Sequence, residues 1–178
     1  MKQTIRVERL LRESVETPYC DLVTRSTGRL VRTSIQQALA AGDAPVALLD
    51  FSEVGLVDLS CADEIIAKLL LDPPGATYLV LQGLREEQLE AIEHVLQHHD
   101  LAALVCDPDA GRTRPVGRLS PDLHTAFAAI QALRGATLEE LADHTGWPRD
   151  RAGAAAEALF RLRLIRQNGA RYQAPLDA

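Results

Sequence analysis

A single stretch of the chain, residues 45–71, predicts a buried strand that is followed closely by an amphipathic helix. It reads PVALLDFSEVGLVDLSCADEIIAKLLL. Its apolar run over residues 46–49 is typical of a central strand that is buried on both faces of a sheet. Residues 61–71 repeat apolar side chains at helical spacing, so one side of this helix is apolar and the other is charged. The charged residues on that other side are Asp63, Glu64 and Lys68.

The connection between this strand and this helix carries a motif. Its residues are Asp50, Phe51, Ser52, Val54, Asp58 and Ser60. In this order they resemble the STAS fold of anti-sigma-factor antagonists, in which a strand runs into D-x-S-x-V and then D-S-S-G. Leu59 replaces the first Ser of D-S-S-G, and Cys61 replaces its Gly. The continuation S-C-A-D-E is closer to a divergent STAS-like group in which S-F-A-D-E opens the helix. The resemblance implies a STAS-like α/β domain.

Ser60 has two interpretations at the start of this helix. In antagonists of the STAS kind the Ser at this position is phosphorylated by a partner kinase, and a helix N-terminus favours phosphate. Asp58, Asp63 and Glu64 place negative charge in the same turn, which disfavours a phosphate. Ser60 is therefore either a partner switch or a plain helix cap. All three acidic residues are candidate partner-docking residues, and for Asp58 and Glu64 the alternative is a satisfied cap.

Further strands and helices flank this stretch. Strands are expected near residues 3–11, 77–81 and 101–106, and helices near residues 27–41 and 85–99. Short links between alternating strands and helices predict an α/β layer with a mostly parallel sheet. Ser26 and Thr27 offer a cap for the helix that ends near Ala41. The basic residues Arg25, Arg29 and Arg32 form either a solvated face or a site for a partner or an anion.

A change of composition marks the end of this first domain. Residues 107–115 are polar and rich in turn-forming residues. We therefore predict a STAS-like domain over residues 1–112, a linker over 113–119 and a second domain over 120–178. As an alternative, residues 116–119 add a strand to the first domain.

The sequence over residues 120–178 predicts three helices and a hairpin. Ser120-Pro121 opens the first helix, and Thr137 with Glu140 forms a capping box for the second. A third helix is expected over residues 149–162, and Asn168-Gly169 is a strong hairpin signal. The segments T-L-E-E-L-A-D-H-T-G and A-L-F-R-L-R-L-I resemble the winged helix-turn-helix family over about residues 120–175. That family often has Gly soon after its last helix, where this chain has Arg163.

The winged-helix resemblance implies a site for double-stranded DNA, with the third helix in the major groove. The candidate nucleic-acid-binding residues are Arg149, Arg151, Arg161, Arg166 and Arg171. The alanine-rich middle of this helix offers almost no side chains that reach base edges, so contacts would go to phosphates. The alternative interpretation is that this domain mediates protein contact or dimerisation.

No catalytic or cofactor-binding motif is present, and no enzyme activity, cofactor or metal is expected. His94 and His98 have i, i+4 spacing on one helix, but no third ligand accompanies them, so a solvated helix face is favoured. Cys61 lies near a helix start, which favours a thiolate, yet a small buried Cys is the stronger interpretation.

Charge and cysteine content restrict the cellular setting. The net charge of −6 is carried entirely by residues 1–118, which argues against generic binding to polyanions. Three cysteines without C-x-x-C spacing favour a reduced, cytoplasmic protein. No apolar leader and no membrane-spanning run are recognised, so no membrane partner is expected.

Together these features predict a non-enzymatic regulatory or signalling protein. In the first hypothesis it is a transcription-linked adaptor that combines a STAS-like protein-interaction domain with a winged-helix DNA-binding domain. In the alternative it is a partner-switching protein of the anti-sigma-factor-antagonist type, whose winged helix mediates protein contact or dimerisation. The expected partner is a kinase or an anti-sigma-like protein, with DNA or a second copy of the chain as a further partner.

Overall fold

The strand at the centre of the 45–71 stretch, β2 (Val46–Asp50), lies between two parallel neighbours in a sheet. The computed structural model describes residues 1–16, 18–107 and 109–177, and the chain divides into two units, residues 1–117 and 118–178. The sheet of the first unit has the order β1-β2-β3-β4-β5, with the first four strands parallel and β5 antiparallel to β4. Its other strands are β1 (Lys2–Arg6), β3 (Tyr78–Gln82), β4 (Ala102–Asp107) and β5 (Arg112–Gly117).

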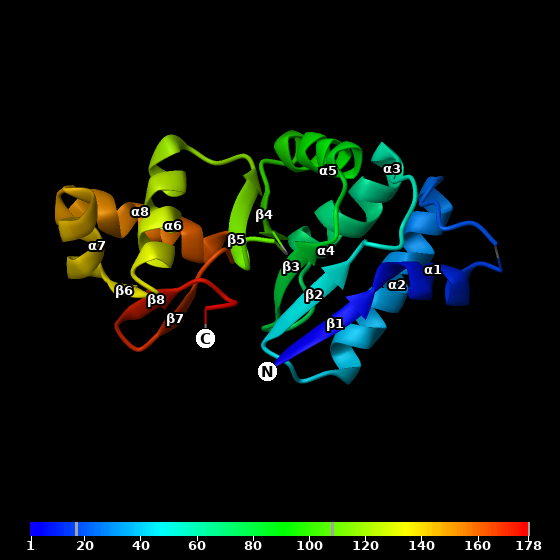
Figure 1. Ribbon diagram of the computed structural model, residues 1–178, viewed down its shortest axis with the longest axis horizontal. Helices are drawn as coiled ribbons and strands as arrows, with labels where there is room; N and C mark the ends of the chain where they lie inside the picture. The colour runs from blue at the N-terminus through cyan, green and yellow to red at the C-terminus, as the bar shows by residue number, and fades with distance from the viewer. Residues whose placement is uncertain (17, 108, 178) are drawn as a thin grey trace. The chain divides into compact units, whose positions relative to one another are not determined.

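The helices of this unit share one core with one face of the sheet. Each parallel strand pairs with the strand that precedes it in the chain, so every crossover steps in the same direction. Right-handed crossovers therefore place the helices on the same face, as Figure 1 shows. Ala47, Leu49 and Leu81 point from the sheet into the shared core. The helices are α1 (Val7–Ser14), α2 (Arg25–Ala41), α3 (Leu59–Ala62), the π-helix η1 (Asp63–Ala67), α4 (Lys68–Leu71) and α5 (Glu86–His98).

These elements confirm the predicted α/β class and the burial of residues 46–49. The strand predicted over residues 3–11 is wrong beyond Arg6, because a helix begins at Val7. Val7 and Leu11 are both fully buried, and their i, i+4 spacing suits one face of a helix. The cap predicted at Ser26 or Thr27 is also displaced, since Thr24 caps α2 by accepting the N–H of Thr27.

The linker predicted over residues 113–119 is wrong over most of its length. Residues 112–117 form β5, and Val116 pairs with Ala103 across the antiparallel ladder. Thr113 and Val116 are buried, which anchors the strand to the sheet. Pro115 is tolerated because β5 is an edge strand, where a missing N–H donor removes little pairing. The alternative prediction, a strand over residues 116–119, is confirmed only at Val116 and Gly117, because β5 begins at Arg112 and ends at Gly117.

The helix predicted over residues 61–71 begins earlier and is irregular. It starts at Leu59 and passes through the π-helical segment η1 before it returns to α-helix at Lys68. A π-helical segment inside an α-helix is rare and is frequently found at functional sites.

The second unit packs three helices against a small sheet. Its elements are α6 (Pro121–Ala132), β6 (Ala136–Thr137), α7 (Leu138–Thr145), α8 (Arg149–Arg161), β7 (Arg166–Asn168) and β8 (Arg171–Gln173). Its three strands are antiparallel in the order β6-β8-β7. The predicted capping box of Thr137 and Glu140 is confirmed, and so is the hairpin at Asn168-Gly169. Arg163 has a φ of 57°, the left-handed conformation for which glycine is favoured after a helix.

Candidate functional site

Two loop segments from different parts of the first unit run side by side. Residues 20–24 lead into α2, and residues 55–58 lead into α3. The N–H of Leu22 donates to the carbonyl of Leu56 at 2.7 Å, and the N–H of Asp58 donates to the carbonyl of Leu22 at 3.0 Å. These backbone hydrogen bonds hold the starts of α2 and α3 next to each other.

Asp58 connects the two helix starts. Its Oδ1 accepts the N–H of Cys61 at 2.7 Å, which makes Asp58 the N-cap of α3. Its Oδ2 accepts the N–H of Thr24, the N-cap of α2, at 3.0 Å. Burial raises the pKa of Asp58, but these hydrogen bonds outweigh it, and the pKa lies below its ordinary value. The side chain is therefore a satisfied cap, one of the two roles considered for it.

Thr24 adopts a strained backbone conformation at this junction. Its φ is 72°, which is uncommon for a β-branched residue and costs about 1–3 kcal/mol. Its N–H donates to Asp58, and its carbonyl accepts the thiol of Cys61 at 3.0 Å. These contacts hold the conformation, and such strain is typical of ligand clamps and switch regions.

Ser60 lies half-buried in the first turn of α3 and supports the cap. Its Oγ donates to Oδ1 of Asp58 at 2.8 Å. A phosphate at Ser60 would replace this hydrogen bond with two neighbouring negative charges. Such a pair repels by about 4 kcal/mol near a protein surface, whereas a helix N-terminus stabilises an anion by only about 0.3–1 kcal/mol. In this conformation of the turn, the geometry thus favours an unmodified capping Ser60 over a phosphorylated Ser60.

The thiol of Cys61 is buried in the same turn. Burial and the adjacent charge of Asp58 raise its pKa to about 12. The thiol stays protonated near neutral pH, so the buried, unreactive interpretation of this cysteine is the one that the structure favours.

Glu64 is fully buried, although its spacing places it on the charged side of the helix. Its carboxylate accepts hydrogen bonds from the guanidinium groups of Arg25 at 3.0 Å and Arg32 at 2.9 Å, and it also forms an ion pair with Lys68. Burial raises the pKa of Glu64, but the hydrogen bonds and ion pairs to the three cations lower it by more. The pKa therefore lies below its ordinary value. We name these four residues the Glu64 cluster.

Asp63 extends the Glu64 cluster toward α5. Its Oδ2 accepts Arg25 at 2.7 Å, and its Oδ1 lies 2.6 Å from Nε2 of His99. Burial raises the pKa of Asp63, but its hydrogen bonds to Arg25 and His99 lower it below the ordinary value. The cluster therefore joins α2, η1 and the end of α5.

These contacts decide which predicted docking residues are available. Glu64 is buried, so its prediction as a docking residue is wrong, and Asp58 and Asp63 are engaged within the unit. The basic patch predicted at the start of α2 is likewise largely engaged, because Arg25 and Arg32 bind Glu64. The sequence interpretation named Lys68 only as part of the charged side of the helix, and it did not include His99. Only the i, i+4 spacing of Glu64 and Lys68 was a local signal for them.

Four apolar side chains in or next to the paired loops are exposed to solvent. They are Tyr19, Val23, Leu56 and Leu59, and they are between 42% and 69% exposed. We name these residues the Leu56–Leu59 surface. Grouped apolar exposure of this kind marks interaction sites in soluble proteins. The sequence interpretation missed it, because the pairing of the two loops is what brings these residues together.

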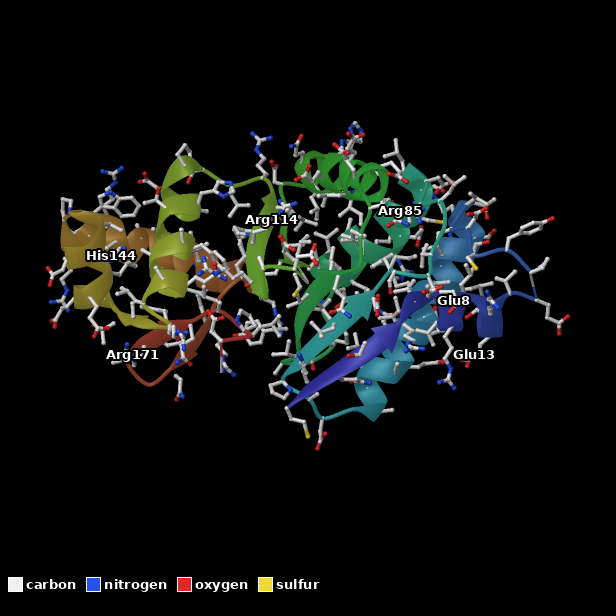
Figure 2. All side chains as sticks on the ribbon, viewed as in Figure 1. Glu8, Glu13, Arg85, Arg114, His144 and Arg171 are labelled. Carbon is white, nitrogen blue, oxygen red and sulfur yellow. The ribbon has the colours of Figure 1, made fainter. Side chains whose placement is uncertain are left out.

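A polar pocket of about 310 Å³ lies at the carboxyl ends of β1 and β2. Its lining residues are Arg6, Glu8, Asp50, Ser52 and Glu53. Oδ1 of Asp50 accepts hydrogen bonds from the backbone N–H of Ser52 at 2.9 Å and from its hydroxyl group at 2.5 Å. We name it the β1–β2 pocket; Figure 2 labels Glu8 in α1, on its lining.

In the second unit, most of the arginines predicted to bind nucleic acid pair with carboxylates. The pairs are Arg149–Glu139, Arg151–Asp122, Arg161–Glu157 and Arg171–Glu140. Figure 2 labels Arg171 on the hairpin. Arg151 also lies over the ring of Trp147, 4.4 Å from its centroid. The Nε of Arg166 is buried and has no partner among the described residues.

Two further features bear on chemistry. Among residues 1–16, 18–107 and 109–177, no group of three or more His, Cys, Asp and Glu side chains is placed to hold a metal ion. In the same described ranges, no helix combines the length and the apolar character needed to cross a membrane.

The chain matches no model of a known protein family, and no curated protein is similar enough to count as a relative.

Proposed function

We propose that this protein is a non-enzymatic, cytoplasmic regulatory adaptor whose first unit binds a protein partner through the Leu56–Leu59 surface. The observation that carries the proposal is the exposure of four large apolar side chains in or next to two loops that are joined by backbone hydrogen bonds. A surface held in one conformation loses little entropy on binding, which favours affinity. The STAS-like resemblance supports the same kind of function, because it too implies partner binding at this turn.

Ser60 is the proposed control point of this surface. Its hydroxyl supports the Asp58 cap, and Asp58 in turn holds the loop before α2. Phosphorylation would remove that hydrogen bond and repel Asp58, so the paired loops would separate. We therefore propose that phosphorylation by a kinase partner releases a docked partner by disordering the surface.

Partner capture in cells tests the docking function. The double variant Leu56→Ser/Leu59→Ser should lose proteins that crosslink to the native chain. Leu71→Ser is the matched control, because Leu71 is similarly exposed but lies at the end of α4. Ser60→Asp should weaken the same crosslinks, and Ser60→Ala should retain them. Equal crosslinking by the native chain and the double variant would contradict the proposal.

DNA binding by the second unit is a second candidate function. The observation that favours it is the order of three helices followed by the β7-β8 hairpin, which is the order on which the winged-helix resemblance rests. The charges argue for weak binding, because Asp150 and Glu157 lie exposed on α8 beside the paired arginines. We therefore rank this activity below partner docking.

Fluorescence anisotropy with random duplex DNA tests this second candidate. If the unit binds DNA, the native chain should bind at low ionic strength, and the affinity should fall steeply with salt. Arg149→Ala and Arg171→Ala should then weaken binding, each removing about one phosphate contact. No binding at low ionic strength, or unchanged affinity in both variants, would leave the second unit as a protein-contact module.

A further inference from the structure

Resting on the proposed docking function, we infer that the partner segment is basic and amphipathic, and that one of its Lys or Arg side chains enters the β1–β2 pocket. The Leu56–Leu59 surface would take the apolar face of that segment. The pocket would take a cation from its polar face.

The pocket lies beside the surface along one continuous loop. β2 ends at Asp50 in the pocket, and the chain then passes through Glu53 to Leu56. The backbone carbonyl of Cys20, which follows Tyr19, accepts the N–H of Gly55 at 2.7 Å. A single bound segment can therefore touch both the pocket and the apolar side chains.

The loop that joins the two is held firmly. The carbonyl of Gly55 accepts Nε2 of Gln88 at 2.6 Å and a guanidinium nitrogen of Arg85 at 2.7 Å. Gln88 is almost completely buried, and it also binds the carbonyl of Val54. Figure 2 labels Arg85 at the start of α5. The distance between pocket and surface is thus fixed before a partner arrives.

The charges around the pocket select a cation. Three carboxylates, those of Glu8, Asp50 and Glu53, line it against the guanidinium of Arg6. Arg12 pairs with Glu8 from outside the lining, which leaves three carboxylates against two guanidiniums.

Glu53 carries the carboxylate that is least compensated, because Arg12 attracts it only at longer range and pairs with Glu8. The Glu53 side chain is exposed, and within the described ranges its carboxylate has an electrostatic interaction with Arg12 but no direct hydrogen bond or ion pair. All of the net negative charge of the chain also lies in residues 1–118, which favours encounter with a basic partner.

A designed peptide pair tests this chemistry in the full-length protein. The probe is a dye-labelled synthetic helix with leucines at i, i+3, i+4 spacing and lysines at its other positions. Its counterpart has glutamates in place of the lysines. Fluorescence anisotropy at low and near-physiological ionic strength should show binding of the lysine peptide only.

Matched variants separate the pocket from general charge attraction. Leu56→Ser should lower the affinity for the lysine peptide about tenfold, because it removes an apolar anchor. Glu53→Gln should weaken it about threefold, because it removes one exposed charge pair. Asp43→Asn is the control for charge, since Asp43 is exposed and precedes β2 at the opposite edge of the sheet; it should leave affinity unchanged.

Three results would overturn the inference. They are equal weakening by Glu53→Gln and Asp43→Asn, equal binding of the two peptides, and no binding of the lysine peptide. If the cellular crosslinks still depend on Leu56 and Leu59 in such a case, the docking function stands and only the basic character of the partner is wrong. If those crosslinks are also independent of both leucines, the docking function fails as well.

Discussion

At the scale of single residues, Glu64 illustrates how tertiary context changes the role of a side chain. Its spacing places it on the charged side of a helix, yet it is fully buried against α2. The reason is that Gly28 of α2 has no side chain there, so the two helices approach closely. Arg25, Arg32 and Lys68 then supply the charge that a buried carboxylate requires.

Glu64→Gln should destabilise the first unit by about 1–2 kcal/mol, because it removes the shared carboxylate of three partly exposed cations, of which Arg25 keeps its pair with Asp63. Chemical denaturation with urea measures the change in the free energy of unfolding. Glu90→Gln is the matched control, since Glu90 is exposed on α5, and it should change stability by less than about 0.5 kcal/mol. Equal stability of Glu64→Gln and the native chain would show that the cluster contributes nothing net.

The pH dependence of the same comparison gives a second readout. The pKa of Glu64 is lower in the folded chain than its ordinary value, because the ion pairs outweigh burial. The stabilisation is therefore complete above the ordinary carboxyl pKa of about 4, and it is lost as the pH falls through the folded value. The stability difference between the native chain and Glu64→Gln should thus shrink below about pH 4. A difference that stays constant there would contradict the assignment.

At the scale of elements, two glycines within helices have opposite effects on stability. A methyl group on Gly28 would lie 3.0 Å from Cβ of Glu64 and 3.1 Å from Cα of Cys61. A methyl group on Gly153 in α8 would make ordinary contacts of 3.7 Å and 3.8 Å with Leu138. Gly28 is therefore required for the approach of α2 to α3 and η1, whereas Gly153 only lowers the helix propensity of α8.

Gly28→Ala should destabilise the protein by about 1 kcal/mol, because the overpacking exceeds the gain in helix propensity. Gly153→Ala should stabilise it by about 0.5–1 kcal/mol, because only the propensity changes. Thermal unfolding of the two variants beside the native chain checks both signs. Stabilisation by Gly28→Ala would mean that α2 can move away from Glu64 at little cost.

Most elements of the chain follow from local patterns. The run over residues 46–49, the capping box at Thr137 and the hairpin at Asn168-Gly169 each depend on neighbouring residues only, and each is confirmed. The start of α1 and the bounds of β5 were mispredicted, because Val7 and Val116 are buried by elements distant in sequence.

At the scale of the whole molecule, the division into residues 1–117 and 118–178 predicts that a destabilising substitution in one unit leaves the stability of the other unchanged. Glu64→Gln should increase amide hydrogen exchange in β2, β3 and β4, because these strands share a core with the helix that carries Glu64. Exchange in α6, α7 and α8 should stay unchanged. Mass spectrometry of peptides from the two units measures both, and equal acceleration in both units would show that they unfold as one.

The sequence by itself determined the α/β class, the order of the central strands and helices, and the caps of the second unit, because periodicity and capping act within a few residues. It also identified the Asp58–Ser60 turn as a site of interest. Only the tertiary structure decided that Glu64 is buried, that residues 20–24 pair with 55–58, and that Leu56 and Leu59 remain exposed. These features join residues more than thirty positions apart. Helix packing and loop pairing bring them together, and no local pattern encodes that proximity.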